Sequence, residues 1–510
     1  MNADGKNRQW LTALVGVWAA VGLVHPALAQ QNTTGPDPVE SELSFETLQG
    51  PKSWAEAREK LERFQEDPLK ASPRELSTPR LLPGDQWAPD CSAPVALDRP
   101  LSLVDVVDLA LCANPQVKAT WAGVKASAAS LGEAKAAYLP TISAGISRVR
   151  DRTSYPDSDL GVQSLQDTSR NFGLNWRLFD FGTRSANQAA ANALLDAALA
   201  THDATLQRLL ESVVGAYFDA QSARASWDSK TQQEQLAQRT LETARRREAT
   251  GAGSQTDTLQ ASTALAKASL ERSRAAGDWN KALAVLVYAL GLPAGTPLQL
   301  AVDLNDDSTG VERELAEWLS QAQAQHPAIL AARAQLEAAR QRVASVRTEG
   351  LPTLDLGVNQ YRNGRPNQGL PTLQSSERVI AVTMSIPIFE GFARSYKTRG
   401  AEAQAEQKGA ELLDIENQVL MNVVKAHADA VAALANLGAS DDLHKAAMLA
   451  TESVRRKLDK GATDMIEMLT VQATLADAEQ QRIRSLADWR SARLRLFAAA
   501  GRLGHLQLAK

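Results

Sequence analysis

Two long stretches of the chain carry apolar residues at helical spacing, and no proline interrupts either of them. The first covers residues 185–250, where Leu206, Leu210 and Val213 recur at intervals of three or four positions. The second covers residues 395–460. At a rise of about 1.5 Å per residue, a helix of this length extends for roughly 100 Å. Such a length does not fit one globular domain and is typical of coiled-coil assemblies.

A turn of small residues ends each long helix, and a shorter returning helix follows it. Gly251 and Gly253 mark the first turn and Gly461 the second, because glycine tolerates the backbone angles that tight turns require. The returning helices are expected over residues 257–290 and 466–500. Each long helix therefore forms a hairpin with its returning helix.

Another helix precedes the strands in each half of the chain. In the first half, Asn114 suits an N-cap and Pro115 the first helical position, and the helix ends near Ala137. In the second half the helix covers residues 327–348. Placed end to end at ~1.5 Å per residue, this helix and the returning helix are about as long as the long helix. We infer that each long helix lies beside two shorter, stacked helices.

Between the helices, each half contains two runs in which apolar residues alternate with polar or small ones. The expected strands cover residues 141–150 and 171–181 in the first half, and 353–362 and 378–388 in the second. The length of each run is close to that of a membrane-spanning strand, which has about 9–11 residues. The segments between paired strands are rich in Gly, Asn, Asp and Ser, like long extracellular loops. Four strands of a soluble sandwich are the alternative interpretation.

The alternation also assigns residues to the two sides of these strands. The side that faces lipid is expected to carry Leu354, Leu356, Trp176 and Leu178. The opposite side, which faces a water-filled interior, is expected to carry Asp355, Asn359, Arg177 and Asn175.

The two halves are copies of one another. Pro115 matches Pro327 at an offset of 212 residues (327 − 115), and Arg245 matches Arg455 at an offset of 210 (455 − 245). A length difference of two residues between the paired strands accounts for the change, and loops absorb such changes at little cost. The chain is therefore a tandem duplication, with a first repeat over residues 101–300 and a second over residues 301–510.

The N-terminal segment has the features of a secretory signal. A basic start is followed by an uncharged apolar run from Trp10 to Val24 and by the small-x-small sequence Ala27-Leu28-Ala29. We expect a signal peptide over residues 1–29 and an N-terminal periplasmic extension over residues 30–100. A membrane anchor is the alternative, although the run is shorter than the ~20 residues that a spanning helix needs.

Composition excludes several function classes. The net charge of −4 provides no basic field for nucleic acid, and no phosphate-binding Gly-x-x-x-x-Gly-Lys-Ser/Thr sequence occurs. Six histidines and two cysteines form no metal-ligand pattern. No Ser, His and acid cluster suggests catalysis, so we expect neither an enzyme nor a cofactor.

A membrane role has to come from the strands or from surface association, because no apolar stretch of 18 residues follows the signal. Open strand edges cannot lie in lipid, and four strands do not close a barrel within one chain. Such a role therefore requires several copies, and cyclic symmetry is the economical arrangement.

The two cysteines are Cys91 and Cys112. In an oxidising periplasm they can form a disulfide that ties the extension to the first helix. Two buried thiols are the alternative.

Several motifs resemble those of the TolC family of outer-membrane export channels. They are Leu178-Phe179-Asp180-Phe181-Gly182, Ile388-Phe389-Glu390-Gly391, Thr256-Asp257-Thr258-Leu259-Gln260-Ala261 and the segment from Gly461 to Leu469. The resemblance covers about residues 101–505. It implies a mainly α fold with a membrane β-barrel: a homotrimer with a shared twelve-stranded barrel in the outer membrane and a long α-helical periplasmic tunnel. It also implies a periplasmic adaptor (membrane fusion) protein and an inner-membrane ABC transporter or RND pump as partners.

The resemblance further implies a periplasmic gate at the tips of the two hairpins. The outer acidic ring of the family's constriction falls on Glu467, whereas the inner ring position falls on the uncharged Thr470. In the family, a Thr-Asp pair of the first hairpin hydrogen-bonds the gate shut. That pair matches Thr256 and Asp257.

The usual partners of that pair are replaced in this chain. The family's tyrosine and arginine on the second hairpin fall on Leu458 and Thr463. Nearby Arg455, Arg456 or Lys460 could substitute electrostatically, although exposed ion pairs usually contribute under about 1 kcal/mol. Alternatively, these tip residues are a solvated face and an N-cap.

Two cargo classes are consistent with the resemblance. The sequence around Cys91 and Cys112, with a Leu-Ser-Leu start before an Asn-Pro pair, resembles the CyaE-like, toxin-secretion branch. This favours the exit duct of a type I secretion system that exports a large protein such as an RTX toxin or haemolysin. The alternative is the outer-membrane component of a tripartite multidrug efflux pump. A periplasmic coiled-coil scaffold is a third hypothesis, which the alternating strands disfavour.

Overall fold

The computed structural model describes residues 67–72, 91, 97–155, 161–301, 314–363, 375–460 and 462–504. These residues belong to one compact unit, Gln65–Lys510. The expected signal peptide (residues 1–29), most of the expected extension (residues 30–100) and Gly461 lie outside the described residues.

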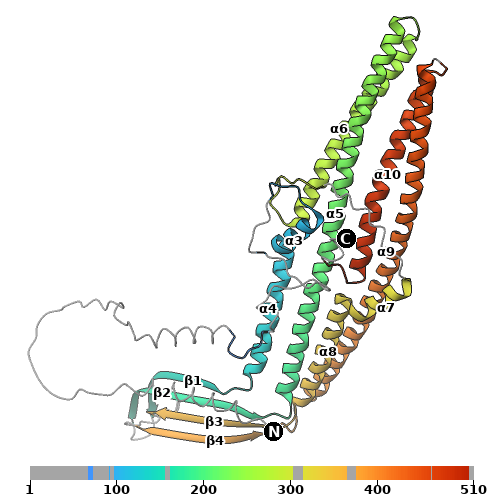
Figure 1. Cartoon of the computed structure of the whole chain (residues 1–510). Helices are drawn as coiled ribbons and strands as arrows, with labels where there is room; N and C mark the ends of the chain where they lie inside the picture. Colours follow the sequence, from blue (N-terminus) through green and yellow to red (C-terminus); the bar gives the residue numbers. More distant parts are fainter. Residues whose placement is uncertain are drawn as a thin grey trace, which may run out of the picture. The chain divides into compact units, whose positions relative to one another are not determined.

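The two repeats contain the same elements in the same order (Figure 1). The first repeat consists of α3 (Leu103–Ala113), α4 (Pro115–Ala136), β1 (Thr141–Tyr155), β2 (Gly161–Phe179), α5 (Thr183–Ala249) and α6 (Gln255–Leu290). The second consists of α7 (Leu315–Gln325), α8 (Pro327–Thr348), β3 (Thr353–Arg362), β4 (Ser376–Ser385), α9 (Ala393–Asp459) and α10 (Met465–Ala499). The α5–α6 and α9–α10 hairpins end side by side, at the end of the helices opposite the sheet.

Two short helices, α3 and α7, were not among the elements that the sequence predicts. A capping box fixes the start of α3, because the Ser102 side chain accepts from the Asp105 N–H and the Asp105 carboxylate accepts from the Ser102 N–H. Both short helices cover hydrophobic cores. Val106 of α3 packs with Tyr217 of α5, and Trp318 of α7 is fully buried in the second core.

The first strand pair is longer than the sequence predicts. β1 continues to Tyr155 instead of ending at residue 150, and β2 begins at Gly161 instead of at residue 171. Residues 151–155, which lie beyond the expected end of the strand, pair in antiparallel register with residues 161–165 of β2. The expectation was wrong because a sheet is held by backbone hydrogen bonds, which charged side chains do not prevent.

The ends of β2 and β4 also differ from the expected residues 181 and 388. β2 ends at Phe179 because Phe181 and Gly182 have φ angles of 52° and 100°, outside the strand region. β4 covers Ser376–Ser385, and Gly391 and Phe392 after it likewise have positive φ, at 60° and 64°. The chain thus makes the same sharp turn from sheet to long helix in both repeats.

The shorter helices stack end to end through a glycine in each repeat. Gly291 ends α6 with a φ of +74°, and a Cβ there would lie 2.8 Å from the Asn114 Cα at the start of α4. Gly501 after α10 has the same φ, and a Cβ there would lie 3.2 Å from the His326 Cα before α8. The Asn114 side chain donates a 2.9 Å hydrogen bond to the Ala289 carbonyl across the first junction. The inferred stacking beside each long helix is therefore confirmed.

The described parts of the N-terminal region attach to the first repeat at two places. Cys91 and Cys112 form a disulfide with a Cα–Cα distance of 5.4 Å. Ala71 is buried against α4 near Gly132, and Lys135 Nζ donates a 2.9 Å hydrogen bond to the Lys70 carbonyl. Residues 67–72 therefore pack against α4, and Cys91 is tied to α3, so both attach to helices that precede β1.

Candidate functional site

The four strands form one antiparallel sheet in the order β1-β2-β3-β4, and its two sides differ in polarity. One side is apolar and exposed, as for Ile146 (76 %), Ile380 (67 %) and Val382 (62 %). Trp176 and Leu356, both expected to face lipid, are paired with each other, and Leu356 is also paired with Val382, so they lie on this same side. Among the described residues, no helix combines the length and apolarity needed to cross a bilayer.

The other side of the sheet is polar and closely packed. Arg177 and Asp355 are paired in register, and their side chains form an ion pair at 2.9 Å. Asn359 lies against Gly173, where a Cβ would come within 2.8 Å of the Asn359 side-chain oxygen. Asn175, Arg177, Asp355 and Asn359 thus share one side, as the alternation predicts.

The sheet has two open edges within one chain, because β1 and β4 each pair with a single neighbour. Unpaired strand edges in lipid leave backbone donors and acceptors without partners. A membrane-inserted sheet of this kind is complete only when strands of further copies pair with both edges.

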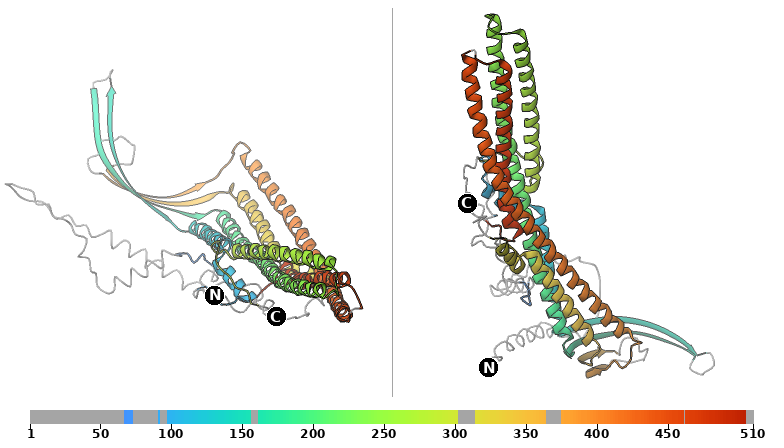
Figure 2. Two further views of the ribbon diagram at one scale, coloured as in Figure 1. Left: turned by 90° about the horizontal axis from the view of Figure 1, so that it is seen from above. Right: turned by 90° about the vertical axis from the view of Figure 1, so that its right-hand side faces the viewer.

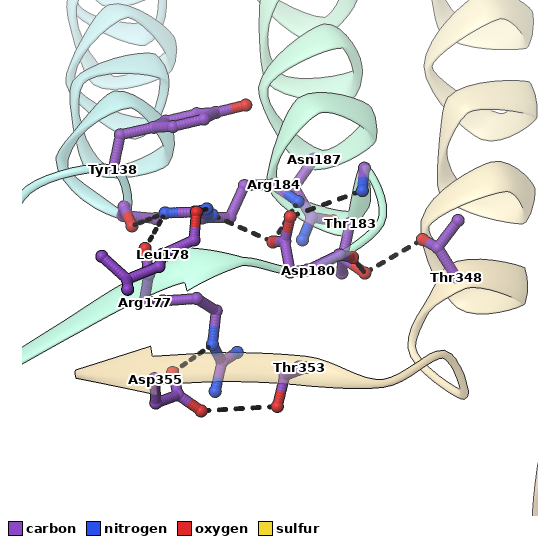
Figure 3. Close-up of polar contacts among 12 residues, drawn as sticks. Tyr138, Arg177, Leu178, Asp180, Thr183, Arg184, Asn187, Thr348, Thr353 and Asp355 are labelled. Atoms are coloured by element: carbon purple, nitrogen blue, oxygen red, sulfur yellow. Dashed lines mark hydrogen bonds and ion pairs between the residues drawn. The ribbon is translucent and has the colours of Figure 1, made fainter. Parts of the chain in front are cut away.

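A buried polar cluster joins the sheet to α5 in the first repeat (Figure 3). The Asp180 carboxylate accepts hydrogen bonds from the backbone N–H and the Nε of Arg184, each at 3.0 Å. The Arg184 guanidinium also donates to the carbonyls of Arg177 and Leu178, at 2.8 and 3.3 Å, and lies 4.6 Å from the centre of the Tyr138 ring. Hydrogen bonds between charged groups are stronger than neutral ones, so this cluster fixes the direction in which α5 leaves the sheet.

The matching cluster of the second repeat is open to solvent. Glu390 and Arg394 are paired at 3.2 Å, but their side chains are 47 % and 36 % exposed. The residue that corresponds to Tyr138 is Gly350 (350 − 138 = 212), and the Arg394 guanidinium occupies the space that a side chain there would fill. The second repeat therefore keeps the ion pair without its aromatic cover.

The tip of the first hairpin is held by local hydrogen bonds. Asp257 forms a capping box with Ser254: its carboxylate accepts from the Ser254 N–H at 3.1 Å, and its own N–H donates to the Ser254 hydroxyl at 3.2 Å. Thr258 donates to Glu248 across the turn at 2.6 Å, and Thr256 is exposed. At this tip Ser254 is the N-cap of α6, and Asp257 is the third helical residue of its capping box.

The tip of the second hairpin presents the expected gate residues. The Asp464 carboxylate caps α10 by accepting from the Glu467 N–H at 2.8 Å. The Thr463 hydroxyl donates to the Glu467 carboxylate, and Thr470 donates to the Ile466 carbonyl at 2.8 Å. Glu467 and Thr470 are both exposed, one turn apart on α10.

The two hairpins contact each other through an apolar cluster near their tips. Its buried members are Leu241, Ala244, Ala261, Val454, Leu458, Met465 and Met468. Two hydrogen bonds accompany it: Arg247 donates to the Leu458 carbonyl at 3.3 Å, and Gln472 donates to Thr240 at 3.3 Å. Leu458, where the resemblance predicts a lost partner, therefore links the hairpins by burial. Sequence reasoning missed this link, although Leu241 and Leu458 both follow the helical apolar spacing.

The expected electrostatic substitutes do not reach the first hairpin. Arg456 pairs with Glu452 of its own helix at 3.6 Å, and Arg455 and Lys460 are exposed. Among the described residues, no hydrogen bond or ion pair joins these three to Asp257. Nor do the described residues gather three metal-ligating side chains in one place.

Comparisons with known proteins agree with this geometry. A family model described as outer membrane efflux protein matches residues 106–292 and again residues 318–502. The two matched segments correspond to the two repeats, so the tandem duplication is confirmed.

Relatives are found by sequence and by fold. The chain is 37 % identical over 433 residues to Protein CyaE of Bordetella pertussis, covering 84 % of this chain and 90 % of that protein. It is 24 % identical over 423 residues to the alkaline protease secretion protein AprF of Pseudomonas aeruginosa, covering 80 % and 86 %. The crystal structure of the Campylobacter jejuni CmeC outer membrane channel matches with a TM-score of 0.68 at 16 % identity, over 84 % of this chain and 94 % of that one.

Proposed function

Because the chain belongs to the outer membrane efflux protein family, we propose that it is the exit duct of a type I secretion system, through which a large protein such as an RTX toxin or haemolysin leaves the cell. Members of the family are transport proteins that span the outer membrane and periplasm, and they are not enzymes. The observation that carries the choice of cargo is the similarity to AprF, whose name describes alkaline protease secretion, beside the higher identity to CyaE.

Channels of this family form trimers, and a homotrimer is the assembly proposed here. β1 of one copy pairs with β4 of the next, which closes the sheet and removes its open edges. Exposed apolar side chains along α9 support this assembly, including Leu413 (62 %), Val431 (49 %) and Leu449 (68 %). Such rows on a single chain are typical of protein interfaces.

In this proposal the polar side of the closed sheet lines a water-filled route for the cargo. Asn175, Asn359 and the Arg177–Asp355 pair would face that route, while the apolar side contacts lipid. The chain carries no nucleotide-binding sequence, so energy is supplied by an inner-membrane ABC transporter that reaches the hairpin tips through a periplasmic adaptor.

Glu467 is the proposed constriction residue at the periplasmic entrance. Its exposed carboxylate lies in the first turn of α10, where Thr463 orients it. Three copies would bring three such carboxylates around one axis, with the uncharged Thr470 one turn further along. The apolar cluster around Leu458 would then hold the hairpins together when the entrance is closed.

Deleting the gene distinguishes the two cargo classes. We expect one large protein to disappear from the medium, with drug sensitivity unchanged and export restored by the plasmid-borne gene. The family's description as efflux proteins favours a second candidate, the outer-membrane component of a drug efflux pump. Increased drug sensitivity with normal protein secretion would establish that candidate and contradict the first.

The gate is tested on purified protein in planar bilayers. Glu467→Ala should raise the single-channel conductance or abolish block by multivalent cations, because the charge at the narrowest point is removed. Glu452→Ala, which removes an exposed carboxylate from the other helix of the same hairpin, is the matched control. Equal behaviour of the two variants would remove Glu467 from the constriction.

A further inference from the structure

One side of the sheet carries exposed apolar residues, and towards one end of the strands arginines follow them on that same side. Successive residues of a strand point to opposite sides, so residues two apart share a side. In β1 the even-numbered residues Ile142 and Ile146 are exposed and apolar. Arg148, Arg150 and Arg152 follow on the same side, and all three are exposed.

The strand register extends this arrangement across the whole sheet. Arg170 of β2 is paired with Ile146 of β1 and with Arg362 of β3, and directly paired residues share a side of the sheet. Arg378 of β4 is paired with Gln360 of β3, two residues before Arg362. Each of the four strands therefore contributes at least one exposed arginine to the side that carries the apolar rows.

Charge on the two sides of the sheet is unequal. Among the described side chains of the strands, the acids Asp355 and Glu377 lie on the polar side, where Asp355 pairs with Arg177 at 2.9 Å. On the apolar side the described side chains include no acid, and Arg378 donates to the Gln360 side-chain oxygen at 3.1 Å. Considering the described side chains alone, the arginines therefore make this side of the sheet positively charged.

The depth of this surface matches the edge of a bilayer. Leu354 begins the apolar rows of β3, and Arg362 is eight residues further on (362 − 354). Eight residues of strand span about 27 Å, which at a tilt of about 40° is a height of roughly 21 Å, close to the ~25 Å apolar band of outer-membrane barrels. The arginines lie at the end of the strands that is distant from the helices, where β1 and β2 extend past β3 and β4 (Figure 2). That end faces the outer leaflet if the helices are periplasmic.

We propose that this arginine belt binds the phosphate groups of anionic lipids in the outer leaflet; its members are Arg148, Arg150, Arg152, Arg170, Arg362 and Arg378. Guanidinium groups pair with phosphate oxygens through two parallel hydrogen bonds, a geometry that lysine does not reproduce. Exposed arginines directly above an apolar band have these phosphates within reach, and no acid among the described side chains of that side competes for them. The inference rests on the membrane placement of the sheet in the proposed function.

The test measures lipid retention by the full-length protein in detergent. Purified protein is titrated with bisphosphorylated lipid A, and bound lipid is counted by native mass spectrometry. Replacing Arg170, Arg362 and Arg378 together by glutamine should weaken lipid binding at least tenfold, since each basic residue adds to attraction by an anionic lipid surface. Arg177→Gln, on the polar side of the same strands, should bind as the unchanged protein does.

Further experiments distinguish binding of the lipid from binding of free phosphate, and a loss of binding from a loss of folding. Lipid A stripped of its phosphates should not compete, and millimolar inorganic phosphate should not displace bound lipid A. Replacing the same three arginines by lysine keeps the charge, and this variant should regain part of the lost affinity. Equal lipid binding by the glutamine variant, or displacement by inorganic phosphate alone, would overturn the belt. Cargo export is followed in parallel, so that loss of lipid binding with intact export leaves the proposed function standing.

Discussion

The two repeats leave the sheet through the same ion pair in two different environments. In the first repeat, the side chains of Asp180 and Arg184 are only 8 % and 12 % exposed, under the ring of Tyr138. In the second, the matching pair is more than a third exposed, and Gly350 stands where the tyrosine would be. Both repeats therefore keep the ion pair. The exchange of Tyr138 for Gly350 beside it changes how strongly the pair stabilises the connection from the sheet to the long helix.

The helix junctions show the same contrast in a different chemistry. The first repeat caps its stacked helix with Asn114, which does not titrate. The second uses His326, whose Nδ1 accepts from the Ala328 N–H at 3.2 Å and must therefore be unprotonated. The first repeat thus has a buried ion pair and a cap that does not titrate. In the second repeat the ion pair is exposed to solvent, and the cap is a histidine that can be protonated. The second repeat also carries the proposed gate residue, Glu467.

Removing the acid of each pair should give the largest difference between the repeats. Asp180→Ala leaves the Arg184 charge buried and unpaired, which typically costs about 3–5 kcal/mol. Glu390→Ala removes an exposed partner and should cost under about 1 kcal/mol. Thermal unfolding of the two purified variants measures the difference. Equal losses of stability would refute the contrast between the junctions.

Acid should destabilise the second repeat through its cap. Burial lowers the pKa of His326 from 6.5 to about 4. Because the folded-state pKa is the lower one, the contribution of this group is present above pH 6.5 and is lost as the pH falls from 6.5 towards 4. The loss at pH 4 amounts to about 3 kcal/mol.

The matched variant for this effect is His326→Asn, which copies the cap of the first repeat. Unfolding by denaturant between pH 7 and pH 4 should show a shallower loss of stability in the variant than in the unchanged protein. Parallel curves for the two proteins would mean that His326 is not the group responsible.

Exchanging the aromatic cover should produce a smaller effect. Tyr138→Ala removes a ring that contacts the Arg184 guanidinium, and such contacts contribute about 1 kcal/mol. Gly350→Ala pushes the flexible end of Arg394 aside, so its cost should be smaller still. Melting temperatures of the two variants rank these effects. A larger loss for Gly350→Ala would show that Arg394 is fixed in place.

Sequence periodicity predicted the large elements because each is specified many times over. The apolar spacing around Leu210 recurs over many turns of α5, and the duplication repeats a second uninterrupted helix of the same length in α9. The last part of β1, residues 151–155, was missed because its pairing depends on the backbone, while the polar run from Asp151 to Ser154 gives no alternating pattern.

At the candidate site, the sequence could predict only contacts between residues that are close together in the chain. The expected local capping role of the tip residues is present as a capping box, with Ser254 as the N-cap of α6 and Asp257 three residues later. The packing of Leu458 against Leu241 joins residues of different hairpins, which no local pattern encodes. The contact of Arg184 with the ring of Tyr138 likewise joins α5 to the turn between α4 and β1, far apart in the sequence.

The central proposal, that the hairpin tips form the gated entrance through which cargo enters the duct, is tested most directly by tying the two hairpins of each chain together. Thr240 of α5 and Gln472 of α10 are hydrogen-bonded across the two hairpins at 3.3 Å, and the chain's own cysteines are joined in a disulfide. Cells carrying Thr240→Cys with Gln472→Cys are treated with a short bifunctional thiol reagent, and the secreted protein is measured beside each single variant. The account predicts that export stops only in the cross-linked double variant. Undiminished export through the cross-linked channel would contradict it.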